Sequence, residues 1–318
     1  MFLTSKSSWV AFGFISWLLT ANLPNPIAQA HTSPSAQPEA IAKSAILPTG
    51  QPLTALAQRL TQLHTAHYAG LEVGMTIVDL ETGNYLSLNG DRLYATASII
   101  KLPILIALFQ EVDAGRVRLD ESLTMTRDMV AGGSGNMQYQ QVDSQFSVLE
   151  TATRMITISD NTATNMIVRR LGGIQALNDR LQRWGLQHTR MQNLLPDRFG
   201  TNVTTANELA KLLAMLDRRQ LLSASSQAQV LNIMSRVQNR TLLPAGLGQG
   251  AAIAHKTGDI GAVQGDAGII RLPSGKRYLA AILVKRDRND PNSRDFIQAA
   301  SRLVYNYLSQ PPTTARVN

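Results

Sequence analysis

Residues 97–112 read ASIIKLPILIALFQEV and join a serine, a lysine three positions later and a long apolar run. The run predicts an apolar helix with Ser98 and Lys101 at its start. Side chains three positions apart share one face of a helix, so the Lys101 amine is expected to reach the Ser98 hydroxyl. The positive end of the helix dipole favours a developing negative charge at the serine. The pattern is typical of a serine nucleophile activated by a lysine.

Two further short motifs follow in order, SDN at residues 159–161 and KTG at residues 256–258. Each motif alone is weak, because SDN is an ordinary helix start and KTG an ordinary loop or strand end. The field of the helix dipole and a nearby Lys256 would lower the pKa of Lys101 and make its amine a proton acceptor. The motifs carry weight only when all three are taken together and in this order.

The surrounding sequence predicts an α/β (α+β) fold. A helix at 53–68 and a hairpin at 71–89 open the folded region, and strands at 265–272 and 278–285 with a helix at 293–308 close it. These elements can form one antiparallel sheet flanked by the two terminal helices. The block between them is mostly helical and is expected to be an insertion with its own core; its predicted helices span 102–112, 147–158, 163–171, 174–184 and 206–216.

All three motifs, in this order and around a helical block, resemble the class A β-lactamases and their penicillin-binding relatives. The resemblance covers nearly all of the mature chain, which is expected to begin at His31. It implies a β-lactamase-like domain at 51–318, with a sheet part at 51–95 and 241–318 and an all-helical part at 96–240.

The resemblance also assigns roles to single residues. Ser98 would be the nucleophile, Lys101 its base, and Ser159 a proton shuttle to the leaving nitrogen. The backbone N–H groups of Ser98 and Asp259 would form the oxyanion hole. The residues expected to hold the substrate are Asn161, Asn193, Lys256, Thr257 and Gly258.

One position departs from the family pattern. Class A β-lactamases carry a loop glutamate, four residues before an asparagine, that activates the water for deacylation. Counted from residues 204–206, Asn193 fits the asparagine and Thr189 stands in the place of the glutamate. A general base contributes ~10²–10⁴-fold to a step, so deacylation is expected to be slow.

The N-terminus reads as a secretory signal. Lys6, an apolar stretch at 9–19 and the run AQA at 28–30 predict a signal peptide over 1–30, with the mature chain starting at His31. Residues 31–50 read as a flexible leader rich in Pro, Ser, Ala and Gln. The protein is therefore expected to be exported, to the periplasm or the extracellular space.

Composition narrows the chemistry further. The chain has 318 residues, no cysteine and a net charge of +8 that is dispersed along the sequence. No metal, cofactor or nucleic acid is expected, and the protein should be a monomer acting on a β-lactam or a peptidoglycan peptide. Three functions stay open: a β-lactamase-type hydrolase, a D-alanyl-D-alanine carboxypeptidase or related penicillin-binding wall enzyme, and a binder that does not turn its ligand over.

Overall fold

The computed structural model describes residues 50–310. The predicted signal peptide, its cleavage before His31 and the leader up to residue 49 lie outside the described residues. Within residues 50–310, no helix is both long and apolar enough to cross a membrane.

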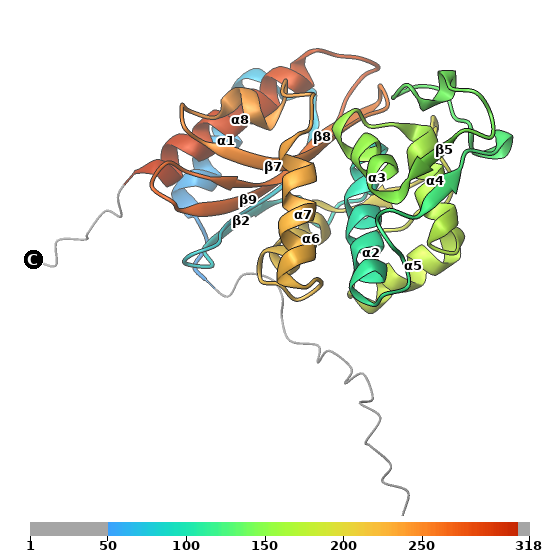
Figure 1. The fold of residues 1–318 in the computed structure, drawn as a ribbon. Coiled ribbons are helices and arrows are strands. Elements are labelled where there is room, and N and C mark those ends of the chain that lie inside the picture. Colours follow the sequence, from blue (N-terminus) through green and yellow to red (C-terminus); the bar gives the residue numbers. More distant parts are fainter. Residues whose placement is uncertain (1–49, 311–318) are drawn as a thin grey trace, which may run out of the picture. The chain divides into compact units, whose positions relative to one another are not determined.

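A five-stranded antiparallel sheet organises the molecule (Figure 1). Its strand order is β2-β1-β9-β8-β7, so strands from the two ends of the described chain pair at the centre, and β7 and β2 are the two edges. The strands span Glu72–Asp79 (β1), Tyr85–Leu88 (β2), Ala252–Asp259 (β7), Val263–Arg271 (β8) and Arg277–Lys285 (β9).

Both faces of the sheet are buried, and β9 shows how the sequence achieves this. Its side chains alternate between two hydrophobic clusters, with Tyr278, Ala280, Ile282 and Val284 in one cluster and Leu279, Ala281 and Leu283 in the other. Successive side chains of a strand point to opposite faces. A strand covered on both faces therefore reads as a continuous apolar run.

Helices from the two ends of the described chain cover one face of the sheet. Helix α1 (Thr54–His67) places Leu56 and Leu60 in the same cluster as Phe296 of α8 (Asn292–Ser309). The two helices lie side by side across the strands (Figure 1).

Helices from the middle of the sequence meet the opposite face. Helix α6 (Ala206–Asp217) packs against β1, β8 and β9. The other helices from the middle of the sequence lie together on this side of the molecule (Figure 1). One hydrophobic cluster runs unbroken from these helices into the sheet, so the division at residues 95/96 and 240/241 stays a prediction. The remaining helices span Lys101–Asp113 (α2), Val148–Thr157 (α3), Asn161–Arg170 (α4), Gly173–Arg183 (α5) and Ala224–Ser235 (α7).

Short elements complete the fold. Strand β3 (Tyr94–Ala95) pairs with β6 (Val203–Thr204), which ties the loop before α6 to the segment before Ser98. Strand β4 (Ser122–Thr124) pairs with β5 (Gln145–Ser147) within the helical region. The 3-10 turns span Ala97–Ile100 (η1), Arg127–Met129 (η2), Met137–Tyr139 (η3) and Leu243–Gly246 (η4).

Candidate active site

Ser98 lies in η1, the 3-10 turn that leads directly into α2. The turn is held close to the edge strand β7, because a Cβ added at Gly258 would lie 2.9 Å from the Thr96 carbonyl oxygen and 3.0 Å from the Ala97 Cβ. Ala97 has a φ of +45°, in the left-handed region that costs a non-glycine residue ~1–3 kcal/mol. The surrounding fold therefore fixes the position of Ser98.

Lys101 is fully buried and meets four oxygen atoms. Its Nζ lies 2.6 Å from the Ser159 carbonyl oxygen and 2.8 Å from Asn161 Oδ1, both of which only accept hydrogen bonds. It also lies 3.0 Å from the hydroxyls of Ser98 and Ser159. A neutral amine has two N–H groups for the two acceptors and keeps one lone pair for a hydroxyl proton. This geometry fits a base that serves Ser98.

Burial and neighbouring charge lower the pKa of Lys101 well below its usual value. The largest cause is the loss of water around the ammonium, and the positive charge of Lys256 acts in the same direction, while Asp160 opposes them. The shift is toward the neutral, proton-accepting form.

The SDN motif lies where the loop before α4 becomes helix. Ser159 has a φ of +58°, which turns its carbonyl and hydroxyl toward Lys101. Asp160 is the N-cap of α4; its buried carboxylate accepts from the backbone N–H of Ala163 at 2.9 Å and also from two N–H groups of the loop that carries Ser134. Asn161 donates to the Gly132 carbonyl at 2.9 Å. These hydrogen bonds hold the motif in place around Lys101.

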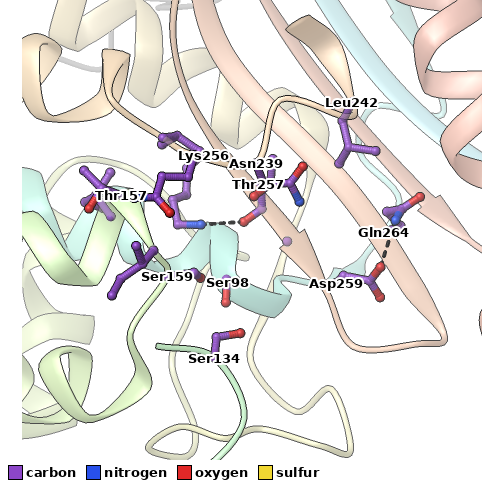
Figure 2. Close-up of a pocket in the computed structure, with 15 residues that line it drawn as sticks. Ser98, Ser134, Thr157, Ser159, Asn239, Leu242, Lys256, Thr257, Asp259 and Gln264 are labelled. Carbon is purple, nitrogen blue, oxygen red and sulfur yellow. Dashed lines mark hydrogen bonds between the residues drawn. The ribbon is translucent and has the colours of Figure 1, made fainter. Parts of the chain in front are cut away.

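Lys256 and Thr257 come from β7, on the other side of the site. Lys256 is fully buried, and its Nζ donates to the Thr257 carbonyl at 2.8 Å (Figure 2). Burial lowers the pKa of Lys256 to about 8, with Asp266 opposing the shift. At neutral pH this side chain is a cation placed to meet an anionic group.

Two cavities meet at Ser98. The first, of about 280 Å³, is lined by Ser98, Ser159, Lys256 and Thr257 (Figure 2). The second, of about 510 Å³, also includes Ser98 but extends past Asn161 toward the loop at 193–200. A substrate that acylates a serine has a leaving side and an acyl side, and the site provides one cavity for each.

The comparisons with known proteins agree with this geometry. The model of the Beta-lactamase enzyme family matches residues 55–308. The chain belongs to this family. The match also confirms the resemblance seen in the three motifs.

Individual relatives support the same assignment. The chain is 26% identical over 247 residues to the extended-spectrum β-lactamase PER-1 of Pseudomonas aeruginosa, covering 71% of this chain and 79% of the relative. It is 26% identical to a β-lactamase of Bacillus licheniformis, covering 75% and 80%. Among solved structures, a leucine-to-glutamate mutant of PBP-A in an acyl-enzyme complex with penicillin G is 49% identical, with a TM-score of 0.80 and coverage of 82% and 99%. The predicted β-lactamase-like α+β fold is thereby confirmed.

The prediction that Thr189 takes the place of the family's loop glutamate is wrong. Thr189 is buried away from Ser98, where its hydroxyl lies 2.6 Å from Glu208 Oε2 and 2.8 Å from the Thr204 hydroxyl. It lines neither of the two cavities that contain Ser98. The count from residues 204–206 assumed a longer path through the loop than the chain takes.

Leu195 is a buried loop residue that lines the acyl side of Ser98, and the sequence analysis missed it. It lines the larger cavity together with Ser98. Its backbone N–H and carbonyl are both held by the side chain of Asn165, at 2.9 and 2.8 Å. Asn165 lies one turn after Asn161 on the buried face of α4. A second asparagine one helical turn after Asn161 was the available signal.

Asn193 and Asp197 of the same loop are engaged by other loop residues. Asn193 donates from Nδ2 to the Thr201 hydroxyl at 2.8 Å and lines neither cavity, so its predicted contact with substrate has no support in this geometry. Asp197 lines the larger cavity, but its carboxylate accepts from Thr201 N and Oγ1 and from Asn202 N, at 2.7 to 3.0 Å. Asp197 is therefore occupied as a structural acceptor.

Asp259 is the other acid on the cavity walls. Arg286 binds both of its carboxylate oxygens, at 2.7 and 2.9 Å, and Gln264 donates to it at 2.8 Å. The acids that line the two cavities of residues 50–310 are Asp197 and Asp259. Neither offers a free carboxylate for activating water.

Proposed function

We propose that the chain is a serine hydrolase of the β-lactamase family that forms an acyl-enzyme on Ser98 with β-lactams and clears it slowly. The observation that carries the proposal is the contact of the buried, pKa-lowered Lys101 with Ser98 Oγ, on a site whose acyl side presents Leu195. Acylation has its base, while deacylation lacks the carboxylate that would activate water.

The remaining motif residues take the roles expected from the family. Ser159 passes a proton from Lys101 to the leaving nitrogen, because Lys101 Nζ lies 3.0 Å from its hydroxyl. Lys256 and Thr257 hold the substrate carboxylate in the smaller cavity. The backbone N–H groups of Ser98 and Asp259 stabilise the oxyanion. Asn161 holds the acyl amide at the entrance of the larger cavity.

A second candidate is a D-alanyl-D-alanine carboxypeptidase, and the same cavity walls favour it. An opened β-lactam keeps its leaving nitrogen attached, so the smaller cavity stays filled and water cannot approach from the side of Lys101. A peptide releases its terminal D-alanine, which empties that cavity. Water can then enter beside Ser159 and Lys101, so a site without a carboxylate near Leu195 can still turn over a peptide.

One experiment tests the proposal and separates the candidates. The purified protein is mixed with benzylpenicillin or with a diacyl-Lys-D-Ala-D-Ala peptide, and the intact mass and the released D-alanine are followed over time. A penicillin adduct that persists for many minutes supports the acyl-enzyme proposal, and steady D-alanine release adds the peptidase function. No adduct with benzylpenicillin would contradict the proposal, and rapid burst-free penicillin hydrolysis would contradict slow clearance.

The proposal also includes the compartment in which the protein acts. The signal-like N-terminus supports export to the periplasm or extracellular space, where peptidoglycan peptides and β-lactams are met. We propose that the protein acts there as a monomer.

A further inference from the structure

The larger cavity has an unbalanced charge on its outer wall. Four charged residues line it: Asp197, Arg198, Asp259 and Arg288. The two acids are already bound by their own neighbours, as described above. Within residues 50–310, neither Arg198 nor Arg288 takes part in an ion pair. Arg286 compensates Asp259, whereas Asp197 is bound only by neutral donors. The wall therefore presents two guanidinium groups against the one carboxylate of Asp197, an excess of one positive charge.

The two arginines come from separate loops that meet beside the site. Arg198 follows Leu195 in the loop at 193–200, and Arg288 lies in the connection between β9 and α8. A Cβ added at Gly200 would lie 3.0 Å from Ile260 Cδ1, which places the first loop against the turn after β7. A Cβ added at Gly261, in that same turn, would lie 3.5 Å from Arg288 Cγ. Both side chains thus border one cavity.

Apolar surface lies next to these cations. Leu195 lines the inner part of the cavity, and Phe199 is 94% exposed at its outer part. Guanidinium groups are the preferred partners of carboxylates, because their planar donors match the two carboxylate oxygens. An acyl group that ends in a carboxylate beyond an apolar stem fits this arrangement better than a cationic one.

We propose that the larger cavity is a subsite for acyl donors that carry a carboxylate on the side away from the reacting bond, with Arg198 and Arg288 as specificity-determining residues. This inference rests on the proposed acylation of Ser98 and adds the class of substrate to it. The carboxylate can belong to the side chain of a penicillin or to a peptidoglycan stem peptide.

The test uses three penicillins that differ at one carbon of the side chain: benzylpenicillin is neutral there, carbenicillin carries a carboxylate and ampicillin an amine. Second-order acylation rate constants are measured by competition with a fluorescent penicillin, in wild type, Arg198→Gln, Arg288→Gln and the double variant. For each variant, the acylation rate constant of carbenicillin or ampicillin is divided by that of benzylpenicillin. Comparing this ratio across variants cancels the intrinsic reactivity of each compound. Arg271→Gln, at an exposed site that lines neither cavity, controls for the same change of net charge.

Each arginine should contribute about two- to fivefold to the carbenicillin ratio, as expected for exposed ion pairs. The ratio should fall in both single variants, fall furthest in the double variant and stay unchanged in Arg271→Gln, while the ampicillin ratio rises. Raising the ionic strength from about 0.1 M to 1 M shortens the screening length from about 10 Å to 3 Å. The wild-type carbenicillin ratio should therefore fall with salt, and that of the double variant should not.

A peptide pair distinguishes the two sources of the carboxylate. Nα-acetyl-Lys-D-Ala-D-Ala is prepared with the ε-amine either succinylated or acetylated, and D-alanine release is compared in the same variants. A succinyl preference that depends on the arginines assigns the subsite to stem peptides, and dependence in the penicillin series alone assigns it to β-lactam side chains. Ratios that are identical in wild type and the double variant in both series would overturn the proposal. Labelling by benzylpenicillin in every variant shows separately that Ser98 acylation is intact.

Discussion

Replacing Leu195 by glutamate should turn a persistent acyl-enzyme into one that is cleared. Leu195 is 6% exposed and lines the cavity of Ser98, so the new carboxylate would lie on the acyl side of the ester. A well-placed general base gives ~10²–10⁴-fold. Because the surrounding loop is not built around a glutamate, we expect a gain at or below the lower end of this range, about 10- to 100-fold faster deacylation.

Burial of the new glutamate opposes this gain, because it raises the pKa of the carboxyl and destabilises the fold. Desolvation raises the pKa of a buried glutamate from about 4.3, and a rise of about two units would still leave most of it ionised at pH 7. The substitution should also destabilise the fold by roughly 2–4 kcal/mol, because a buried leucine is lost and a charge is desolvated. Deacylation in Leu195→Glu should rise with pH to a plateau above the pKa of the new carboxyl.

The assay is a pulse of penicillin followed by removal of the excess, with the adduct on the intact chain followed by mass. Leu195→Gln has the same shape without a proton acceptor and controls for the altered cavity. Thr189→Glu is the second control, and it should not shorten the adduct lifetime, because residue 189 faces Glu208 and a second carboxylate there would be repelled. Equal lifetimes in Leu195→Glu and Leu195→Gln would refute the placement of residue 195 over the ester.

Four further predictions follow from the site and the N-terminus. Ser98→Ala should abolish penicillin labelling without unfolding the protein, and a labelled variant would remove Ser98 as the nucleophile. Lys101→Ala should slow acylation by roughly 10²–10⁴-fold, and normal acylation in this variant would place the base elsewhere. In wild type, the acylation rate should rise with pH to a plateau, because the neutral amine of Lys101 is the base. Since the pKa of Lys256 is about 8 and only its protonated form attracts a carboxylate, KM for carboxylate-bearing substrates should rise above pH 8. A flat profile would contradict that role, and Lys256→Arg, which stays charged, should show one. N-terminal sequencing of secreted protein should begin at His31, and a start at Met1 would indicate an uncleaved anchor.

The catalytic pair was predictable because its signal is local. Spacing alone brings Ser98 and Lys101 together at the start of α2, and the structure has Nζ and Oγ at 3.0 Å. The direction of the Lys101 pKa shift was also predictable, but its main cause was not. The sequence suggested the helix dipole and Lys256, whereas full burial is the largest cause, and burial depends on residues far away in the chain.

The loop before α6 could not be placed from the sequence, because it has no periodic pattern to fix its path. Its course depends on side chains that bind backbone, such as Asn202, which accepts from the N–H groups of Gln192 and Asn193 at 2.7 and 3.0 Å. Contacts of this kind, with those of Asn165 to Leu195 and of Glu208 to Thr189, place Leu195 and not Thr189 on the wall of the Ser98 cavity.

Strand β7 was missed for a related reason. Its sequence AIAHKTGD contains four charged or polar side chains, and two of them, His255 and Lys256, are fully buried. His255 is buried because its Nδ1 lies 2.9 Å from Asp266 Oδ1 on the neighbouring strand, and Lys256 because it closes the wall of the site. Tertiary partners hid the alternation that normally marks a strand.

The position of β7 at the edge of the sheet has a consequence for how an extended substrate can be held. β8 pairs with β7 on one side only, so the outer backbone groups of the strand that carries Lys256 and Thr257 have no strand partner in the described sheet. A peptide lying along this edge would extend the sheet by one strand, taking its affinity from main-chain hydrogen bonds. Side chains around Ser98 would then select among peptides whose backbones bind equally well. A bound peptide would also occupy the strand edge through which two copies of a protein can otherwise aggregate.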